Sequence, residues 1–419
     1  MPSPSIPKKW TVMVYLAGDN NLDSAGVTDL NEMKQVGSND NVNIIAQFDR
    51  ASLSSSTNRY YLRNGTTLAS DIITSLGETN MGDPSVLQGF LEWGIDNYPA
   101  DHYLVVMWNH GNGWDDEDIY RSARTIGLGV TRRSAVLQEA DSKTKRYVSS
   151  DQMRAVSDRF GWSMFAPTVH AAIRTRGIAY DDQAMDFLDN QEVKKVFNAI
   201  KTKLGRKIDI LGMDACLMNM VEVAYEVRDS ISFIVGSEET EPGAGWPYNT
   251  ILERLSANPD MLPAGVSGLI VIKYLASYSA SAGVTQSALD QAKVIDVRQA
   301  VEKLGVLLRM GLKNRTTRLA IFDARRRVQR YHRTDYVDLV DLCVQLKVGR
   351  IPAAARSICD AVINSVRAYV VKNGYKGSSV DGSNGVSIYF PTNGVSRLYS
   401  TLDFAMRSQW AKFIAEFQV

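Results

Sequence analysis

The segment HYLVVMWNHGNG, residues 102–113, decides the fold because it joins a buried strand to a polar, glycine-rich tip. Its apolar run is continuous, which is typical of a strand covered on both faces in a parallel sheet. A strand that only fills a core has no need of the histidine, asparagines and glycines that follow. In open α/β sheets, ligands bind beyond the carboxyl ends of the strands. The segment therefore predicts a functional site at that edge.

Other apolar runs end in the same way, in polar or glycine-rich residues, at 10–21, 42–50, 208–219 and 232–246. Stretches with helical patterns lie between the runs, at 22–37, 85–98 and 190–205. Strand–helix alternation of this kind predicts an α/β fold with a mostly parallel sheet and right-handed crossovers.

The chain is expected to divide near residue 250. Residues 1–250 carry the alternating pattern, interrupted at 114–180 by a basic stretch of weak periodicity that indicates an exposed insertion. Residues 251–419 are expected to form a mainly helical region that returns one strand at 385–391. Its amphipathic runs predict helices at 264–281, 286–311, 335–346, 353–372 and 402–417.

Composition excludes several classes of protein. The apolar fraction is 45%, the charged fraction 22% and the net charge +1, so neither a nucleic acid nor a membrane surface is expected as partner. No segment approaches the roughly 18 apolar residues of a membrane span. Three widely spaced cysteines form no disulfide framework and suit a reducing compartment. We see no signal peptide and expect a cytoplasmic protein, with secretion open if the sequence is trimmed.

His110 and Cys216 both fall at the carboxyl ends of expected strands. A cysteine attacks a carbonyl as a thiolate when a nearby imidazole acts as general base and acid. The same imidazole then protonates the departing amine. Gly111 lets the backbone approach a substrate, and the N–H groups of Gly111 and Cys216 suit an oxyanion. A lone cysteine is more often a small buried hydrophobe. The hypothesis of a catalytic dyad therefore depends on the two strand ends taken together.

These motifs resemble the clostripain family of cysteine peptidases, in the clan of caspases, legumains, gingipains and separases. His-Gly occurs at 110–111 and Ala-Cys at 215–216. Longer similar segments are VMVYLAGDNNLD (12–23), IDILGMDACLMNMVEVAYEV (208–227), VGSEETEPGAGWPYNTIL (235–252) and GVSIYFP (385–391). The resemblance implies a caspase-like three-layer α/β/α fold, a Cys216 nucleophile with His110, and cleavage after Arg or Lys.

Asp214 is the candidate for recognising the basic side chain. It lies two residues before Cys216, so the two residues share a face of an extended strand. The resemblance assigns this position to the pocket for the residue before the cleaved bond (P1), where a carboxylate would pair with Arg or Lys. The alternative is that Asp214 caps the helix that follows.

A second acidic group is expected from SEETEPGAGW, residues 237–246, whose backbone is also suited to pairing with an extended peptide. The sequence does not rank Glu238, Glu239 and Glu241. We take Glu239 and Ser237 forward as candidate substrate-binding residues.

The basic insertion would itself be a substrate for a peptidase of this specificity. We therefore expect self-cleavage between His110 and Cys216, although an uncut solvated loop is an alternative. The candidate processing residues are Arg121, Arg124, Arg132, Arg133, Lys143, Lys145 and Arg146.

The expected partner is a polypeptide with Arg or Lys at the cleaved position. The sequence requires no cofactor or metal. Calcium is kept as an optional ligand because some relatives need it and because Asp19 and Asp49 end the first two strands. Two alternatives stay open: a latent intracellular switch protease that acts on one partner, and a non-catalytic caspase-like binding module.

Overall fold

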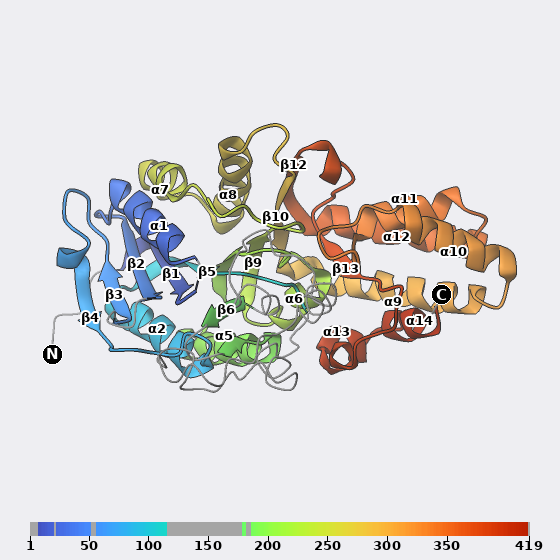
Figure 1. Cartoon of the computed structure of the whole chain (residues 1–419), viewed down its shortest axis with the longest axis horizontal. Coiled ribbons are helices and arrows are strands. Elements are labelled where there is room, and N and C mark those ends of the chain that lie inside the picture. Colours follow the sequence, from blue (N-terminus) through green and yellow to red (C-terminus); the bar gives the residue numbers. More distant parts are fainter. Residues whose placement is uncertain (1–6, 21, 52–55, 115–177, 182–185, 418–419) are drawn as a thin grey trace, which may run out of the picture.

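The computed structural model describes residues 7–20, 22–51, 56–114, 178–181 and 186–417. Its centre is a nine-stranded sheet in the order β12-β10-β9-β8-β5-β1-β2-β3-β4 (Figure 1). The parallel strands are β1 (Lys8–Gly18), β2 (Val42–Arg50), β5 (Ala100–Trp108), β8 (Ile208–Asp214) and β9 (Ile231–Gly236). Antiparallel strands flank them, namely β3 (Asn58–Tyr61), β4 (Ile72–Ser75), β10 (Val284–Asp290) and β12 (Val370–Lys376).

Helices cover both faces of the sheet, which confirms the predicted α/β/α class (Figure 1). One face carries α1 (Asp23–Val36), α7 (Tyr248–Ala257) and α8 (Pro263–Ser277). The other carries α2 (Pro84–Asn97), α5 (Asn190–Leu204) and α6 (Val221–Glu226). Along β1, Val12 and Val14 pack on the first set and Met13 and Tyr15 on the second. Burial on both faces explains why these strands read as continuous apolar runs.

The second half of the chain is mainly helical, as expected, but it also contributes to the central sheet. Its helices are α9 (Val294–Gly311), α10 (Arg315–Arg327), α11 (Leu339–Val348), α12 (Ala353–Tyr369), α13 (Asp403–Met406) and α14 (Trp410–Glu416). The short strands β11 (Tyr336–Asp338) and β13 (Ser387–Tyr389) pair with each other, as do β6 (Ile178–Asp181) and β7 (Asp186–Leu188). The strand predicted at 385–391 is thus β13, and it lies outside the nine-stranded sheet.

Four predicted helices were partly wrong. The first residues of the helix expected at 335–346 form β11, and the helix expected at 402–417 is divided into α13 and α14. The expected helix at 286–311 begins only at Val294, and its first residues belong to β10, while the expected helix at 353–372 gives way to β12 after Tyr369. Strand β10 lies between β9 and β12 and satisfies its backbone groups on both sides. Tertiary pairing of this kind overrides weak local propensity.

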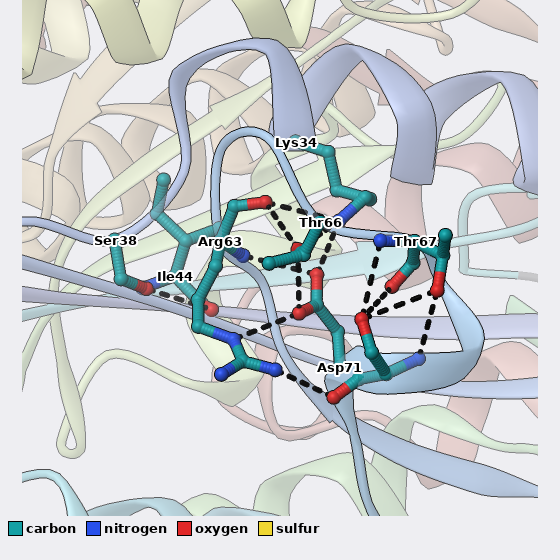
Figure 2. A network of polar contacts seen from close by, with 8 residues as sticks. Lys34, Ser38, Ile44, Arg63, Thr66, Thr67 and Asp71 are labelled. Carbon is teal, nitrogen blue, oxygen red and sulfur yellow. Dashed lines mark hydrogen bonds and ion pairs between the residues drawn. The ribbon is translucent and has the colours of Figure 1, made fainter.

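A buried carboxylate secures the hairpin at one edge of the sheet. The carboxylate of Asp71 accepts bonds from Lys34 of α1, from Arg63 Nε at 2.9 Å and from Thr66 Oγ1 at 2.8 Å (Figure 2). Burial by itself would raise the pKa of Asp71, but these donors outweigh it and lower the pKa. The network ties the β3–β4 hairpin to α1, which holds in place an edge strand that is itself mostly exposed.

Asn219, fully buried, joins the two halves of the chain near the end of β8. Its backbone N–H donates to Ser237 O at 2.9 Å, and its side-chain amide donates to Gly385 O at 3.0 Å. Ser387 N–H returns a bond to the carbonyl of Asn219 at 3.1 Å. The segment after β8 is therefore held in place by residues more than a hundred positions later in the chain.

None of the helices in the described ranges is long and apolar enough to cross a membrane.

Candidate active site

The pairing of β5 with β8 brings the two predicted dyad residues to one edge of the sheet. Trp108 is the register partner of Asp214, and Asn109 N–H donates to Asp214 O at 3.3 Å. His110 and Cys216 each lie two residues beyond this paired position. Because the strands are parallel, both side chains emerge at the same carboxyl edge, and both residues are partly exposed there.

Only glycine fits beside the histidine. A Cβ atom on Gly111 would lie 2.4 Å from Cys216 O and 2.9 Å from the Cβ of Ala215. The backbone after His110 therefore runs directly against the backbone of Cys216. Such close approach lets the two N–H groups expected to bind an oxyanion, those of Gly111 and Cys216, lie on neighbouring segments.

Asn109, almost fully buried, holds the backbone directly before His110 in place. Its side-chain amide donates to Ala17 O at the end of β1, and its Oδ1 accepts the N–H of His110. Beyond the histidine, Tyr336 OH donates to Asn112 O at 2.7 Å. The His-Gly turn is thus held from β1 on one side and from the C-terminal half on the other.

Leu217 adopts a left-handed conformation, with φ of 64°, directly after Cys216. It is the one non-glycine residue with positive φ in the described part of the chain. Its N–H donates to Glu239 O at 3.2 Å. A branched residue in this region costs on the order of 1–3 kcal/mol and persists only where surrounding contacts impose it. The turn directs the thiol toward residues 237–246.

The thiol of Cys216 contacts the backbone of Glu241. Glu241 N–H donates to Sγ at 3.2 Å, and Sγ lies 3.8 Å from Glu241 O. Burial, together with the nearby carboxylates of Glu241, Glu239 and Asp214, raises the pKa of Cys216 to about 12 against the lowering effect of the Glu241 N–H. These surroundings favour the neutral thiol of Cys216 over the thiolate.

Asp214 belongs to a buried acidic cluster with Glu241 and Asp29. Burial raises the pKa of Asp214 to about 6, although bonds from Tyr248 OH at 2.8 Å and Trp246 N–H at 3.2 Å favour its charged form. The carboxyl groups of Asp214 and Glu241 face each other closely enough to share a proton. Burial and Asp214 also raise the pKa of Asp29 to about 9.

No lysine or arginine of the described residues forms an ion pair with any member of this cluster. The ion pairs of the described chain all involve other carboxylates. Burying several carboxyl groups together is unfavourable unless they are neutralised or paired. The cluster is therefore suited to receive a positive charge from outside the chain.

The other candidates on the 237–246 segment make structural contacts. Glu239 accepts the N–H of His332 at 3.0 Å, and Ser237 Oγ bonds with Thr285 Oγ1 at 2.9 Å. A substrate-binding role for either residue stays a prediction. Glu241, which the sequence left unranked, is the acid of this segment that reaches Asp214. A turn signal, Pro-Gly at 242–243, marks where the chain folds back toward Trp246.

Another group of carboxylates lies at the same edge of the sheet, near the carboxyl ends of β1 and β2. Carboxylate oxygens of Asp19, Asp49 and Glu78 all lie within 4.8 Å of one another. Oxygen ligands at this spacing suit a hard cation such as calcium. Asp19 and Asp49 were expected from the sequence and Glu78 was not. Calcium binding itself stays a prediction, and the seven candidate processing residues, Arg121 to Arg146, lie outside the described residues.

The architecture and the paired strand ends define a cysteine peptidase of caspase-like fold. The chain belongs to the clostripain family, whose model matches residues 14–138 and 163–417. Clostripain from Hathewaya histolytica is 26% identical over 463 aligned residues, which cover 94% of this chain and 76% of that protein. A peptidase acts on polypeptides, so the expected class of partner is confirmed at that level.

Solved structures show the same fold. A secreted C11 cysteine protease from Bacteroides thetaiotaomicron, in complex with an irreversible peptide inhibitor, has a TM-score of 0.61 at 19% identity. An inactive zymogen C11 protease from Parabacteroides distasonis has a TM-score of 0.62 at 18% identity. In each case the match covers 96% of this chain and 99% of the other.

Gly111→Ala tests the close approach of the two strand ends. The new methyl group collides with Cys216 O, so the two backbones must separate, and we expect kcat/KM for a peptide substrate to fall by about 100-fold. Gly265→Ala is the matched control, since a Cβ there meets nothing within 4 Å. Circular dichroism should show both variants folded. Wild-type kinetics in Gly111→Ala would contradict the geometry.

Proposed function

We propose that the protein is an endopeptidase that cleaves after Arg or Lys. The observation that carries this proposal is the buried Asp214–Glu241 carboxyl pair, which lies beside the nucleophile without a basic partner among the described residues. A guanidinium or ammonium group from the substrate would supply the missing charge through strong charge-assisted hydrogen bonds. The relationship to clostripain supports the same specificity.

The proposed roles of the residues are as follows. Cys216 gives its thiol proton to His110 and attacks the carbonyl carbon of the cleaved bond to form an acyl-enzyme, while His110 passes the proton to the leaving amine. His110 then takes a proton from water, which releases the acid product and restores the thiol. The N–H groups of Gly111 and Cys216 bind the oxyanion of each tetrahedral intermediate. Asp214 binds the basic side chain.

The test of specificity compares peptides that differ only in Arg, Lys or Asp before the cleaved bond. We expect wild type to cleave the Arg and Lys peptides, and Asp214→Asn to lose about 30-fold or more in kcat/KM, since losing one partner of a buried ion pair costs roughly 2–5 kcal/mol. KM should rise below about pH 6, because the carboxylate that binds the cation becomes protonated.

Asp209→Asn is the control for that variant, since Asp209 lies on the same strand but pairs with Arg206 and His102 at its opposite end. Its kinetics should match wild type. Equal cleavage of all three peptides, or an unchanged Asp214→Asn, would overturn the proposed specificity.

We further propose that the peptidase cuts itself between His110 and Cys216. The seven basic residues from Arg121 to Arg146 support this, as do the anchors on either side of them. The ring of Trp114 packs edge-on against Tyr389 at 4.6 Å, and Asn190 Nδ2 donates to Trp114 O at 3.3 Å. After a cut between Trp114 and Asn190, these contacts would still hold Trp114 and Asn190 to the core.

Intact-mass spectrometry after prolonged incubation tests self-cleavage. Wild type should yield two fragments with an end at one of the basic residues, and they should co-elute in gel filtration because the anchors hold them together. Cys216→Ala should stay whole. If wild type cleaves Arg peptides yet remains intact, the self-cleavage proposal is wrong while the specificity stands.

A further inference from the structure

Glu241 touches both functional parts of the site, the nucleophile and the acidic cluster. Its backbone N–H and carbonyl lie against Cys216 Sγ, at 3.2 and 3.8 Å. Its side chain points the other way, toward Asp214, and is only 7% exposed. Glu241 therefore links the acidic cluster to the thiol within a single residue.

The receptor for a cationic side chain, formed by Asp214, Glu241 and their neighbours, contains buried acceptor atoms that have no hydrogen-bond partner among the described residues. Glu241 Oε2 and Gln286 Oε1 are buried, and neither has a hydrogen-bond partner in the described part of the chain. The hydroxyl of Tyr274 is also buried without a hydrogen-bond partner among the described residues, and it interacts electrostatically with Glu241. A guanidinium offers five N–H donors in a planar fork, whereas an ammonium offers three on one nitrogen. Acceptors spread over several side chains suit the guanidinium better.

Charge provides a second link between the receptor and the thiol. The carboxylates of Glu241 and Asp214 oppose ionisation of Cys216, and they act in a buried setting where screening is weak. A bound cation offsets the negative charge of the Asp214–Glu241 pair. The same event that fills the receptor therefore removes part of the barrier to forming the thiolate.

We propose that Glu241 couples recognition of an arginine side chain to release of the nucleophile. In the empty enzyme, its backbone holds Sγ and its carboxyl group faces Asp214. When a guanidinium enters, Glu241 turns its carboxylate to the ligand, and its backbone yields Sγ to the substrate. Arginine is favoured over lysine because Glu241 and Gln286 together accept more of its donors. This inference rests on the proposed cleavage after basic residues.

The experiment measures the rate at which iodoacetamide alkylates Cys216 at pH 7, with methylguanidine or methylamine as the probe of the receptor. Mass spectrometry locates the adduct, and Cys343 and Cys359 are buried and should not react. We expect methylguanidine to accelerate alkylation of wild type about tenfold, and methylamine to do so less, in line with their donor numbers.

Glu241→Gln keeps the shape but removes the carboxyl group that can become a charged acceptor. It should lose the response to methylguanidine and should show an Arg-to-Lys ratio of kcat/KM reduced by about tenfold. Glu253→Gln, an exposed change on α7, should behave as wild type in both measurements. Thermal unfolding checks that both variants are folded.

The outcomes separate the two claims. If wild type cleaves neither Arg nor Lys peptides, the proposed function fails. If it cleaves them but methylguanidine leaves the alkylation rate unchanged or lowers it, Glu241 does not couple the two events and the inference is overturned. The inference is also overturned if Glu241→Gln retains the response to methylguanidine and the Arg-to-Lys ratio of wild type.

Discussion

The parallel pairing of β5 with β8 is the constraint on which the site depends. Trp108 opposite Asp214 sets the register, and both functional turns begin within two residues of that pair. A slip by one residue would turn every side chain beyond it to the other face of the sheet. Burial on both faces prevents such a slip, since β5 and β8 are almost wholly enclosed by the two helical layers. The helices thus determine the chemistry indirectly, by fixing the register.

The acidic cluster is unfavourable for the empty fold and is sustained by contacts made elsewhere. The folded pKa of Asp214, about 6, exceeds its ordinary value of 3.8, so the free energy of unfolding falls as pH rises through that window. The C-terminal half compensates by holding the segment that carries Glu241. Tyr331 OH donates to Glu238 at 2.8 Å, and Gly385 N–H donates to the same carboxylate at 2.9 Å. The second half of the chain therefore stabilises the segment of the first half that carries the acidic cluster.

The sequence predicted the strands whose ends form the site, because continuous apolar runs with polar tips leave few alternatives. It did not predict β10, whose short polar strand depends on partners on both sides. It also could not choose among the acids of 237–246, since Glu239 and Glu241 differ only in how a turn directs them. The strained Leu217 is equally invisible in sequence, because its conformation is imposed by the contact with Glu239. Local pattern predicts elements, and tertiary contacts decide which side chains meet.

The most direct test of the account is covalent labelling by a peptide acyloxymethyl ketone ending in Arg, with the site and rate read by mass spectrometry. The account predicts one adduct, on Cys216. It should form about 100-fold more slowly in His110→Ala, because general acid–base catalysis by a positioned imidazole contributes a rate factor of about that size. His102→Ala, which changes a histidine at the opposite end of β5, should label as wild type does. Labelling of Cys343 or Cys359, or an unchanged rate in His110→Ala, would contradict the dyad.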